Sequence, residues 1–204
     1  MLFNDTYQTI AKPSEGVFKD KGSKFIAYAY PFQSEIGLKE TIQELKTEHP
    51  KARHHCYAYR LSPDRTVFRV NDDGEPAGTA GRPILNTLLS KDITNVLVVV
   101  VRYFGGTLLG VPGLINAYKT ATEDAINQAV IIQKTVQNVY QISFDYSQMN
   151  DVMKLIKEEN LAAFDQSFDL ACEIKLAINQ SEINRIIGKL EALDHLKIKY
   201  LHTL

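Results

Sequence analysis

Apolar runs and alternating stretches in the first half of the sequence predict a sheet with buried central strands. Residues 96–101 are six consecutive apolar residues, almost all β-branched, and this pattern is typical of a strand covered on both faces. Residues 25–30 predict a second central strand for the same reason. Residues 53–61 alternate instead, so His54 and His55 are expected on opposite faces of a strand, where they cannot bind one metal ion together.

Helical spacing is found between these strands and after them. Apolar residues recur at intervals of four and three between residues 38 and 45, and Ser34 is the candidate N-cap of that helix. The helix should end before Pro50, since the residue before a proline avoids the α region. Residues 82–89 predict a short helix, and residues 114–130 predict a longer one with small alanines along one face.

From about residue 137 the pattern changes to strand, helix, strand, strand, helix, strand. This order is the signature of a ferredoxin-like domain. We therefore expect a domain boundary near residues 132–135. The C-terminal segment carries no cluster of His, Cys, Asp or Glu suited to catalysis, so we interpret it as an RNA-facing or protein-facing module, or as a packing domain.

Composition and charge narrow the function classes. The 204 residues are enough for one large domain or two small ones, and 45% hydrophobic with 23% charged residues is ordinary for a folded chain. A formal net charge of −1 excludes a global basic field but allows a local basic patch. Cys56 and Cys172 fit no metal or disulfide spacing. The chain shows neither a signal peptide nor an apolar run of about 20 residues, which predicts a cytoplasmic protein without a membrane partner.

Two glycine-rich turns, each placed before a helix, are the candidate anion-binding elements. Free N–H groups at a helix start can hold a phosphate, and glycine lets the phosphate approach closely. The alternative is that both turns are tight connections between strands and helices. The residues concerned are Gly78, Thr79, Gly81, Gly105 and Gly106.

An acidic turn precedes the first glycine-rich turn. Asp72, Asp73 and Glu75 surround Gly74, and three carboxylates in so short a stretch are able to hold a divalent cation. An Asp-Gly pair also suits a tight turn, because it tolerates positive φ, and this explains the same residues without a metal. The three acids are therefore metal candidates with a structural alternative.

The motifs around these turns resemble those of a known family. Residues 72–84, joined to residues 101–106, closely resemble the YigZ/IMPACT family, and residues 21–25 and 54–59 fit the same pattern. This resemblance extends up to the expected domain boundary. The ferredoxin-like tail matches the bacterial members, so nearly the whole chain is included.

The resemblance implies an α+β fold in two domains. Residues 1–133 are expected to form the IMPACT/YigZ N-terminal domain, an α/β fold like that of a small-subunit ribosomal protein, with a left-handed β-α-β crossover against the usual handedness. Residues 136–204 are expected to form the ferredoxin-like C-terminal domain. The resemblance also implies a link to translation, RNA or the ribosome, since eukaryotic relatives regulate translation initiation through a protein partner.

The sequence departs from the family pattern near the second glycine-rich turn. Members often carry a lysine before a glycine of that turn and an arginine on the helix behind it, where this chain has Leu109 and Asn116. Pro112 stands where a small residue is usual. Each lost phosphate contact lowers the affinity for nucleic acid. Anion binding is therefore expected to depend on four other cations: Arg102, Arg82, Lys24 and Arg53.

The main functional hypothesis is a non-enzymatic, translation-associated regulator that binds RNA or the ribosome, with no cofactor and no catalytic residue. Its expected phosphate-binding residues are Lys24, Arg53, Arg60, Gly78, Thr79, Gly81, Arg82, Arg102, Tyr103, Gly105 and Gly106. Tyr57 and Tyr59 are expected to join Tyr103 as stacking faces. One alternative is a regulator that binds a translation-related protein. The other is an enzyme in which the acidic turn holds Mg²⁺ and His54 or His55 acts as a base.

Overall fold

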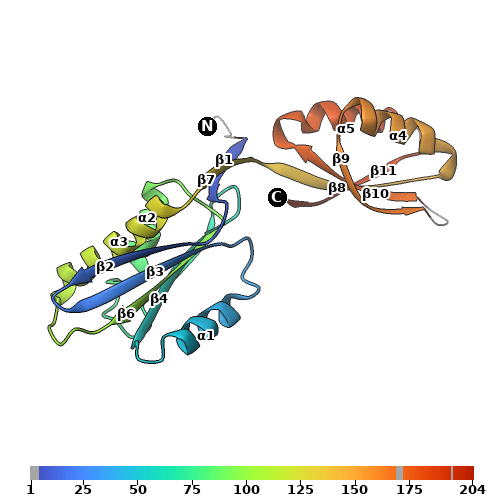
Figure 1. Cartoon of the computed structure of the whole chain (residues 1–204). Coiled ribbons are helices and arrows are strands. Elements are labelled where there is room, and N and C mark those ends of the chain that lie inside the picture. The colour runs from blue at the N-terminus through green and yellow to red at the C-terminus, as the bar shows by residue number, and fades with distance from the viewer. Residues whose placement is uncertain (1–4, 169–171, 194) are drawn as a thin grey trace. The chain divides into compact units, whose positions relative to one another are not determined.

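The computed structural model describes residues 5–168, 172–193 and 195–204 (Figure 1). The chain divides into two compact units, which we treat one at a time. The first unit is Gln8–Lys134, and the second is Thr135–Leu204 together with the residues before Gln8. We propose residues 1–133 as the limits of the N-terminal domain and residues 136–204 as those of the ferredoxin-like domain. Among the described residues, no helix is both long and apolar enough to cross a membrane.

The first unit is built on a five-stranded antiparallel sheet with the strand order β2-β3-β6-β4-β5. These strands are β2 (Ser14–Asp20), β3 (Ser23–Pro31), β4 (His54–Leu61), β5 (Val67–Asn71) and β6 (Val96–Tyr103). Two further strands, β1 (Thr6–Ile10) and β7 (Ile131–Thr135), form a small sheet of their own. The hydrophobic pattern did not predict β7, because four of its five residues are exposed and it lacks a buried face.

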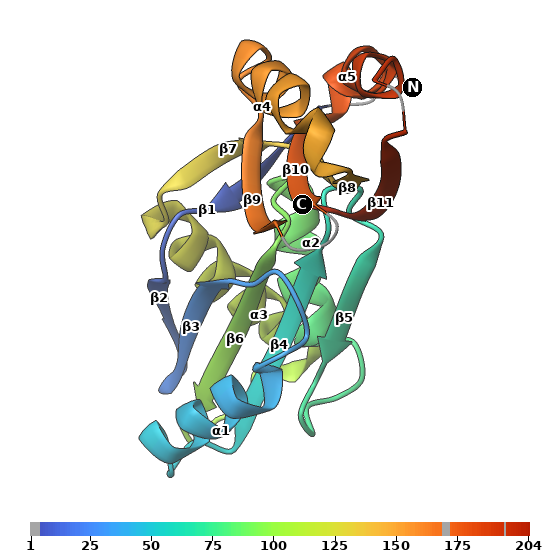
Figure 2. The same cartoon turned by 90° about the vertical axis from the view of Figure 1, so that its right-hand side faces the viewer.

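Helices cover both faces of the large sheet, which explains the apolar run in its central strand. Helix α1 (Leu38–Glu48) packs on one face, and α2 (Gly81–Ser90) and α3 (Gly110–Gln128) pack on the other (Figure 2). Side chains of β6 alternate between the two cores, so every position from 96 to 101 is buried. The expectation of a strand covered on both faces is confirmed.

The order of the strands requires long crossovers. Strands β5 and β6 both run antiparallel to β4, so they are parallel to each other with β4 between them. Helix α2 connects β5 to β6 on the face opposite α1, and this β-α-β connection is left-handed (Figure 2). The unusual hand implied by the family resemblance is therefore present in the fold.

The first helix begins later than the sequence suggested. Its N-cap is Gly37, which adopts φ of 85°, a left-handed conformation that glycine tolerates best. Ser34 does not cap it, so that expectation is wrong. The helix ends at Glu48, before Pro50, as expected.

The second unit is a ferredoxin-like domain, as the sequence predicted. Its four strands form one antiparallel sheet in the order β11-β8-β10-β9, and two helices pack on it around a single apolar core. The elements are β8 (Gln137–Phe144), α4 (Met149–Glu158), β9 (Ala162–Phe168), β10 (Cys172–Asn179), α5 (Ile183–Glu191) and β11 (Lys197–Thr203), with short 3-10 turns η1 (Tyr146–Gln148) and η2 (Gln180–Glu182).

Candidate functional site

Several of the expected residues meet at one end of the first unit's sheet. The strand register places His54 opposite Arg102, and Lys24 opposite Tyr103. Arg53 directly precedes β4 and is exposed. This end, where β3 and β4 begin and β6 finishes, lies at the bottom of Figure 2. We call it the sheet end.

Arg60 does not belong to the sheet end. It pairs in register with Val96, six residues along β4 from His54, which corresponds to about 20 Å at the rise of a strand. Its side chain is buried, and Nη1 donates to the carbonyl of Ile93 at 3.3 Å and lies 3.5 Å from the Asp92 carboxylate. Burial lowers the pKa of Arg60. A single phosphate-binding surface that includes Arg60 is therefore not formed.

Arg102 forms a buried ion pair. Its Nη1 donates to Oε1 of Glu75 at 2.6 Å, and the side chains of the pair are 7% and 3% exposed. The hydroxyl of Tyr118 donates to the same carboxylate oxygen at 2.7 Å. The Arg102 guanidinium also lies over the rings of Phe25 and Phe104, 5.4 and 5.6 Å from their centroids. Burial raises the pKa of the Tyr118 phenol, so Tyr118 keeps the proton that it donates.

The first glycine-rich turn already holds an anion, and that anion belongs to the protein. Asp72 accepts hydrogen bonds from the backbone N–H groups of Gly78, Ala80 and Gly81 at 2.8, 3.1 and 2.8 Å. Its carboxylate thus occupies the N-terminus of α2, where a phosphate was considered. The hydroxyl of Thr79, one of the candidate anion-binding residues, donates to the carbonyl of Pro76 at 2.7 Å.

Replacing Asp72 with alanine is expected to lower the free energy of unfolding by about 1–3 kcal/mol, because three N–H groups at the helix start lose their acceptor. Chemical denaturation followed by circular dichroism measures the loss. Asp72→Asn retains one acceptor oxygen and should lose less. Equal stability of Asp72→Ala and the parent protein would mean that water replaces the carboxylate at no cost.

The acidic turn does not assemble a metal site. Asp73 accepts the backbone N–H of His55 at 2.7 Å through Oδ2, whereas the carboxylates of Asp72 and Glu75 have the partners described above. Within the described part of the chain, no group of three or more His, Cys, Asp or Glu side chains could hold a metal ion. The cation interpretation of these three acids is therefore corrected in favour of turn and helix-cap chemistry.

Glycines at both turns are explained by close packing of the backbone. A Cβ atom on Gly105 would lie 1.9 Å from the carbonyl carbon of Gly22, and one on Gly81 would lie 2.7 Å from the nitrogen of Asn71. Gly78 and Gly106 adopt positive φ of 77° and 87°. Glycine at these positions is required by the fold itself and is therefore no evidence for a bound phosphate.

A pocket of about 520 Å³ opens beside the Arg102 ion pair. We call it the α3 pocket, because the first turn of α3 forms one of its walls. It is lined by Arg53, His54, Glu75, Pro76, Arg102, Phe104, Leu108, Leu109, Gly110, Val111 and Leu114. Gly78 and Arg82 instead line a separate depression between α2 and α3.

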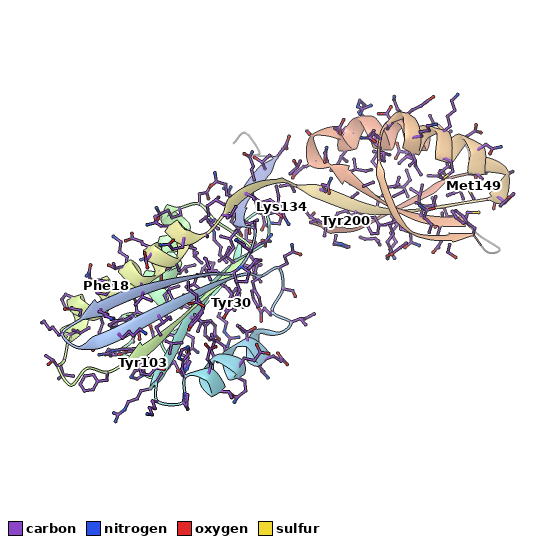
Figure 3. All side chains as sticks on the ribbon, viewed as in Figure 1. Phe18, Tyr30, Tyr103, Lys134, Met149 and Tyr200 are labelled. Atoms are coloured by element: carbon purple, nitrogen blue, oxygen red, sulfur yellow. The ribbon has the colours of Figure 1, made fainter. Side chains whose placement is uncertain are left out.

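The expected tyrosine stacking faces are largely occupied in packing. Tyr57 and Tyr59 are buried in the core beneath α1. Burial raises the pKa of Tyr59 to about 12, helped by its hydrogen bond to Glu35. Tyr103, labelled in Figure 3, lies 2.8 Å from Nδ1 of His49 through its hydroxyl, and Nε2 of that histidine lies 2.8 Å from the hydroxyl of Tyr28.

Comparison with known proteins identifies the family. The sequence of residues 21–126 matches the family model of the Impact N-terminal domain. The IMPACT family member YigZ of Escherichia coli is 31% identical over 88% of this chain and 89% of its own length. The chain belongs to the IMPACT family.

Other IMPACT relatives cover similar shares of the chain. The IMPACT family member YvyE of Bacillus subtilis is 29% identical over 88% of this chain and 82% of its own length. A crystal structure described as that of a hypothetical protein is 28% identical, superposes with a TM-score of 0.76 and covers 98% of both chains. The two-unit architecture is therefore shared with an experimentally solved protein.

The departures from the usual IMPACT pattern lie around the α3 pocket. Leu109 is buried and lines the pocket, and Pro112 and Asn116 are exposed in the first two turns of α3. Sequence reasoning missed Tyr118, Phe104 and Leu108. A lone tyrosine in a helix gives no sign of its partners, but exposed apolar residues directly after a buried strand were a usable signal.

Proposed function

We propose that this protein is a cytoplasmic, translation-related regulator that binds RNA or the ribosome without catalysis. The observation that carries the proposal is the gathering of cations at the sheet end. Lys21 and Lys24 of the β2–β3 hairpin and Arg53 before β4 come from two separate segments to the same end of the sheet. This concentrates positive charge locally in a chain whose net charge is −1.

The sheet end also offers an aromatic surface. Phe104 is 46% exposed directly beyond β6. Proteins that bind single-stranded nucleic acid combine cations that contact phosphates with aromatic rings on which bases stack. Membership of the IMPACT family supports the connection with translation, because eukaryotic relatives of the family regulate translation initiation.

Arg53→Gln is expected to weaken co-sedimentation with ribosomes or RNA about 3–10-fold at low salt and to reduce the salt dependence by about one phosphate contact. Arg53 is the best probe because it is exposed, so its loss should leave the fold intact. Arg102 is unsuitable because its removal breaks a buried ion pair. The experiment compares pelleting of the parent and the variant at low and high salt.

The matched control is Arg82→Gln, which removes an exposed arginine that lines the separate depression. It should pellet like the parent protein. If the parent fails to pellet at low salt, the RNA proposal is wrong. If both variants lose the same amount, the binding surface is not the sheet end.

A second candidate is binding to a translation-related protein, favoured by strand β5. This strand lies at the edge of the sheet and leaves Val67, Phe68 and Val70 exposed. An edge strand with exposed apolar residues can pair with an extended segment of another protein. Nuclease digestion distinguishes the two candidates, because only a complex with a protein partner survives it.

A further inference from the structure

We infer that the α3 pocket binds the phosphate group of a nucleotide, with the base against Phe104. This inference rests on the RNA-binding function proposed above and specifies which part of the nucleic acid the site holds. The pocket volume of about 520 Å³ lies within the range of small-ligand sites. Its lining combines two arginines with an apolar wall of Phe104, Leu108 and Val111.

The first turn of α3 has the properties of an anion-binding helix start. Helix α3 has 19 residues, and among the described residues no side chain caps its N-terminus; its first turn contains no acid. Unpaired N–H groups and the helix dipole give such a terminus a partial positive charge. The start of helix α2 also offers free backbone N–H groups, but there the Asp72 carboxylate accepts hydrogen bonds from those of Ala80 and Gly81. A helix start in this protein can therefore hold a carboxylate. Leu109, Gly110 and Val111, which form this helix start, are among the residues that line the pocket.

Arg102 supplies the second, independent observation. Its side chain is 7% exposed and lines the pocket, but within the described chain its Nε has no hydrogen-bond partner. Buried N–H groups are almost always hydrogen-bonded in folded proteins, so this one lacks an acceptor that a ligand can provide. Glu75 satisfies Nη1 of the same guanidinium, which holds Arg102 in place at the pocket wall.

Arg53 and His54 complete the polar side of the pocket. Nδ1 of His54 lies 2.8 Å from the carbonyl oxygen of Asp73. A carbonyl can only accept, so Nδ1 of His54 carries a proton and donates it, which leaves Nε2 as the ring nitrogen available to a ligand. A nucleotide presents both a phosphate and ribose hydroxyls. The one acid of the lining, Glu75, is already neutralised by Arg102, so it does not repel the phosphate.

The apolar wall selects a ligand with a planar group. Phe104 is 46% exposed and Leu108 is 82% exposed, and both line the pocket together with buried Leu109. One face of the Phe104 ring is near the Arg102 guanidinium, at 5.6 Å from its centroid. A nucleobase stacked on this ring would cover apolar surface that is otherwise in water.

Isothermal titration calorimetry with the full chain tests the inference, using adenosine 5′-monophosphate, adenosine and inorganic phosphate as probes. We expect adenosine 5′-monophosphate to bind at least 10-fold more tightly than either fragment. Arg53→Gln should weaken its binding at least 5-fold, and Phe104→Ala should weaken it without changing the affinity for inorganic phosphate. Arg82→Gln should have no effect. Both pocket residues are exposed, so the variants are expected to fold, which circular dichroism verifies.

A pair of oligoribonucleotides of one sequence distinguishes the two sources of the phosphate. Preference for the 5′-phosphorylated over the 5′-hydroxyl strand assigns the pocket to an RNA end. Equal binding of the strands, with adenosine 5′-monophosphate still bound, assigns it to free nucleotides.

The inference is overturned if adenosine 5′-monophosphate does not bind, or if its binding is the same in the Arg53 and Phe104 variants as in the parent protein. Its failure is separable from that of the proposed function. Co-sedimentation that depends on Arg53, together with no nucleotide binding, leaves the RNA-binding surface in place and removes the pocket. Nucleotide binding without co-sedimentation would instead support the pocket and contradict the proposed RNA-binding or ribosome-binding function.

Discussion

Glu75→Gln is expected to lower the free energy of unfolding by about 3–5 kcal/mol, because it leaves the buried Arg102 cation without a counter-ion. Glutamine keeps the volume and the oxygen that accepts from Tyr118, so the main change is the loss of charge. The glutamate oxygen is 2.6 Å from Arg102 and 2.7 Å from Tyr118, and both side chains of the ion pair are more than nine-tenths buried. Urea denaturation followed by circular dichroism measures the effect.

Two further variants test whether the loss of stability comes from leaving a buried charge unpaired or simply from removing an acid. Glu123→Gln removes an acid from a partly exposed i,i+4 pair with Lys119, 3.7 Å apart, and should change stability by less than about 0.5 kcal/mol. The double variant Glu75→Gln with Arg102→Met removes both buried charges and should recover most of the loss. If Glu75→Gln alone lowers the free energy of unfolding by less than about 1 kcal/mol, water reaches the Arg102 guanidinium and solvates its charge.

Most of the fold was predictable because burial leaves a direct trace in the sequence. A strand covered on both faces must be apolar at every position, as in residues 96–101, and the helices of the second unit must be apolar on one face only. Strand β7 was missed for the complementary reason, since it has almost no buried side chain. The left-handed crossover depends on how distant strands are ordered, which no local pattern records; it was reached through family resemblance alone.

The candidate site was less predictable, because the same residue types satisfy two physical demands. Glycine is needed both where a phosphate approaches and where another backbone does, and Gly105 and Gly81 belong to the second case. Carboxylates suit both a cation and a helix start, and Asp72 serves the helix start. The partners that decide between the two roles are distant in sequence, as Glu75 and Tyr118 are, so spacing alone could not choose.

One part of the site was within reach of sequence reasoning. Arg53 directly precedes strand β4 and Arg60 is its penultimate residue, and a strand of that length separates its ends by about 20 Å. Treating both arginines as one phosphate-binding set was therefore inconsistent with the strand that the same residues predicted. Their separation also sharpens the functional proposal, since the sheet end keeps Arg53 and Lys24 with the α3 pocket and leaves Arg60 to pack at the other end.

Gly105→Ala is the second large effect that we expect, with a loss of about 3 kcal/mol or more in the free energy of unfolding, because backbone cannot yield as a flexible side chain can. The new Cβ would lie 1.9 Å from the carbonyl carbon of Gly22 and 2.1 Å from the nitrogen of Ser23. Relief requires the β2–β3 turn to move away from the end of β6, which also breaks the bond from the Gly105 N–H to the Ser23 hydroxyl at 3.1 Å. Urea denaturation gives the loss.

Gly106→Ala is the matched control, because it changes the neighbouring glycine in the same loop. Its Cβ would meet nothing within 4 Å, so its cost is limited to placing alanine at φ of 87°, about 1–2 kcal/mol. The two variants also differ in function. Moving the β2–β3 turn displaces Lys21 and Lys24 from Arg53, so Gly105→Ala should weaken RNA co-sedimentation even where it remains folded, whereas Gly106→Ala should not. If the two variants are equally stable and bind RNA equally, the contact between Gly22 and Gly105 does not position the cations, and the sheet end owes its arrangement to the strand register alone.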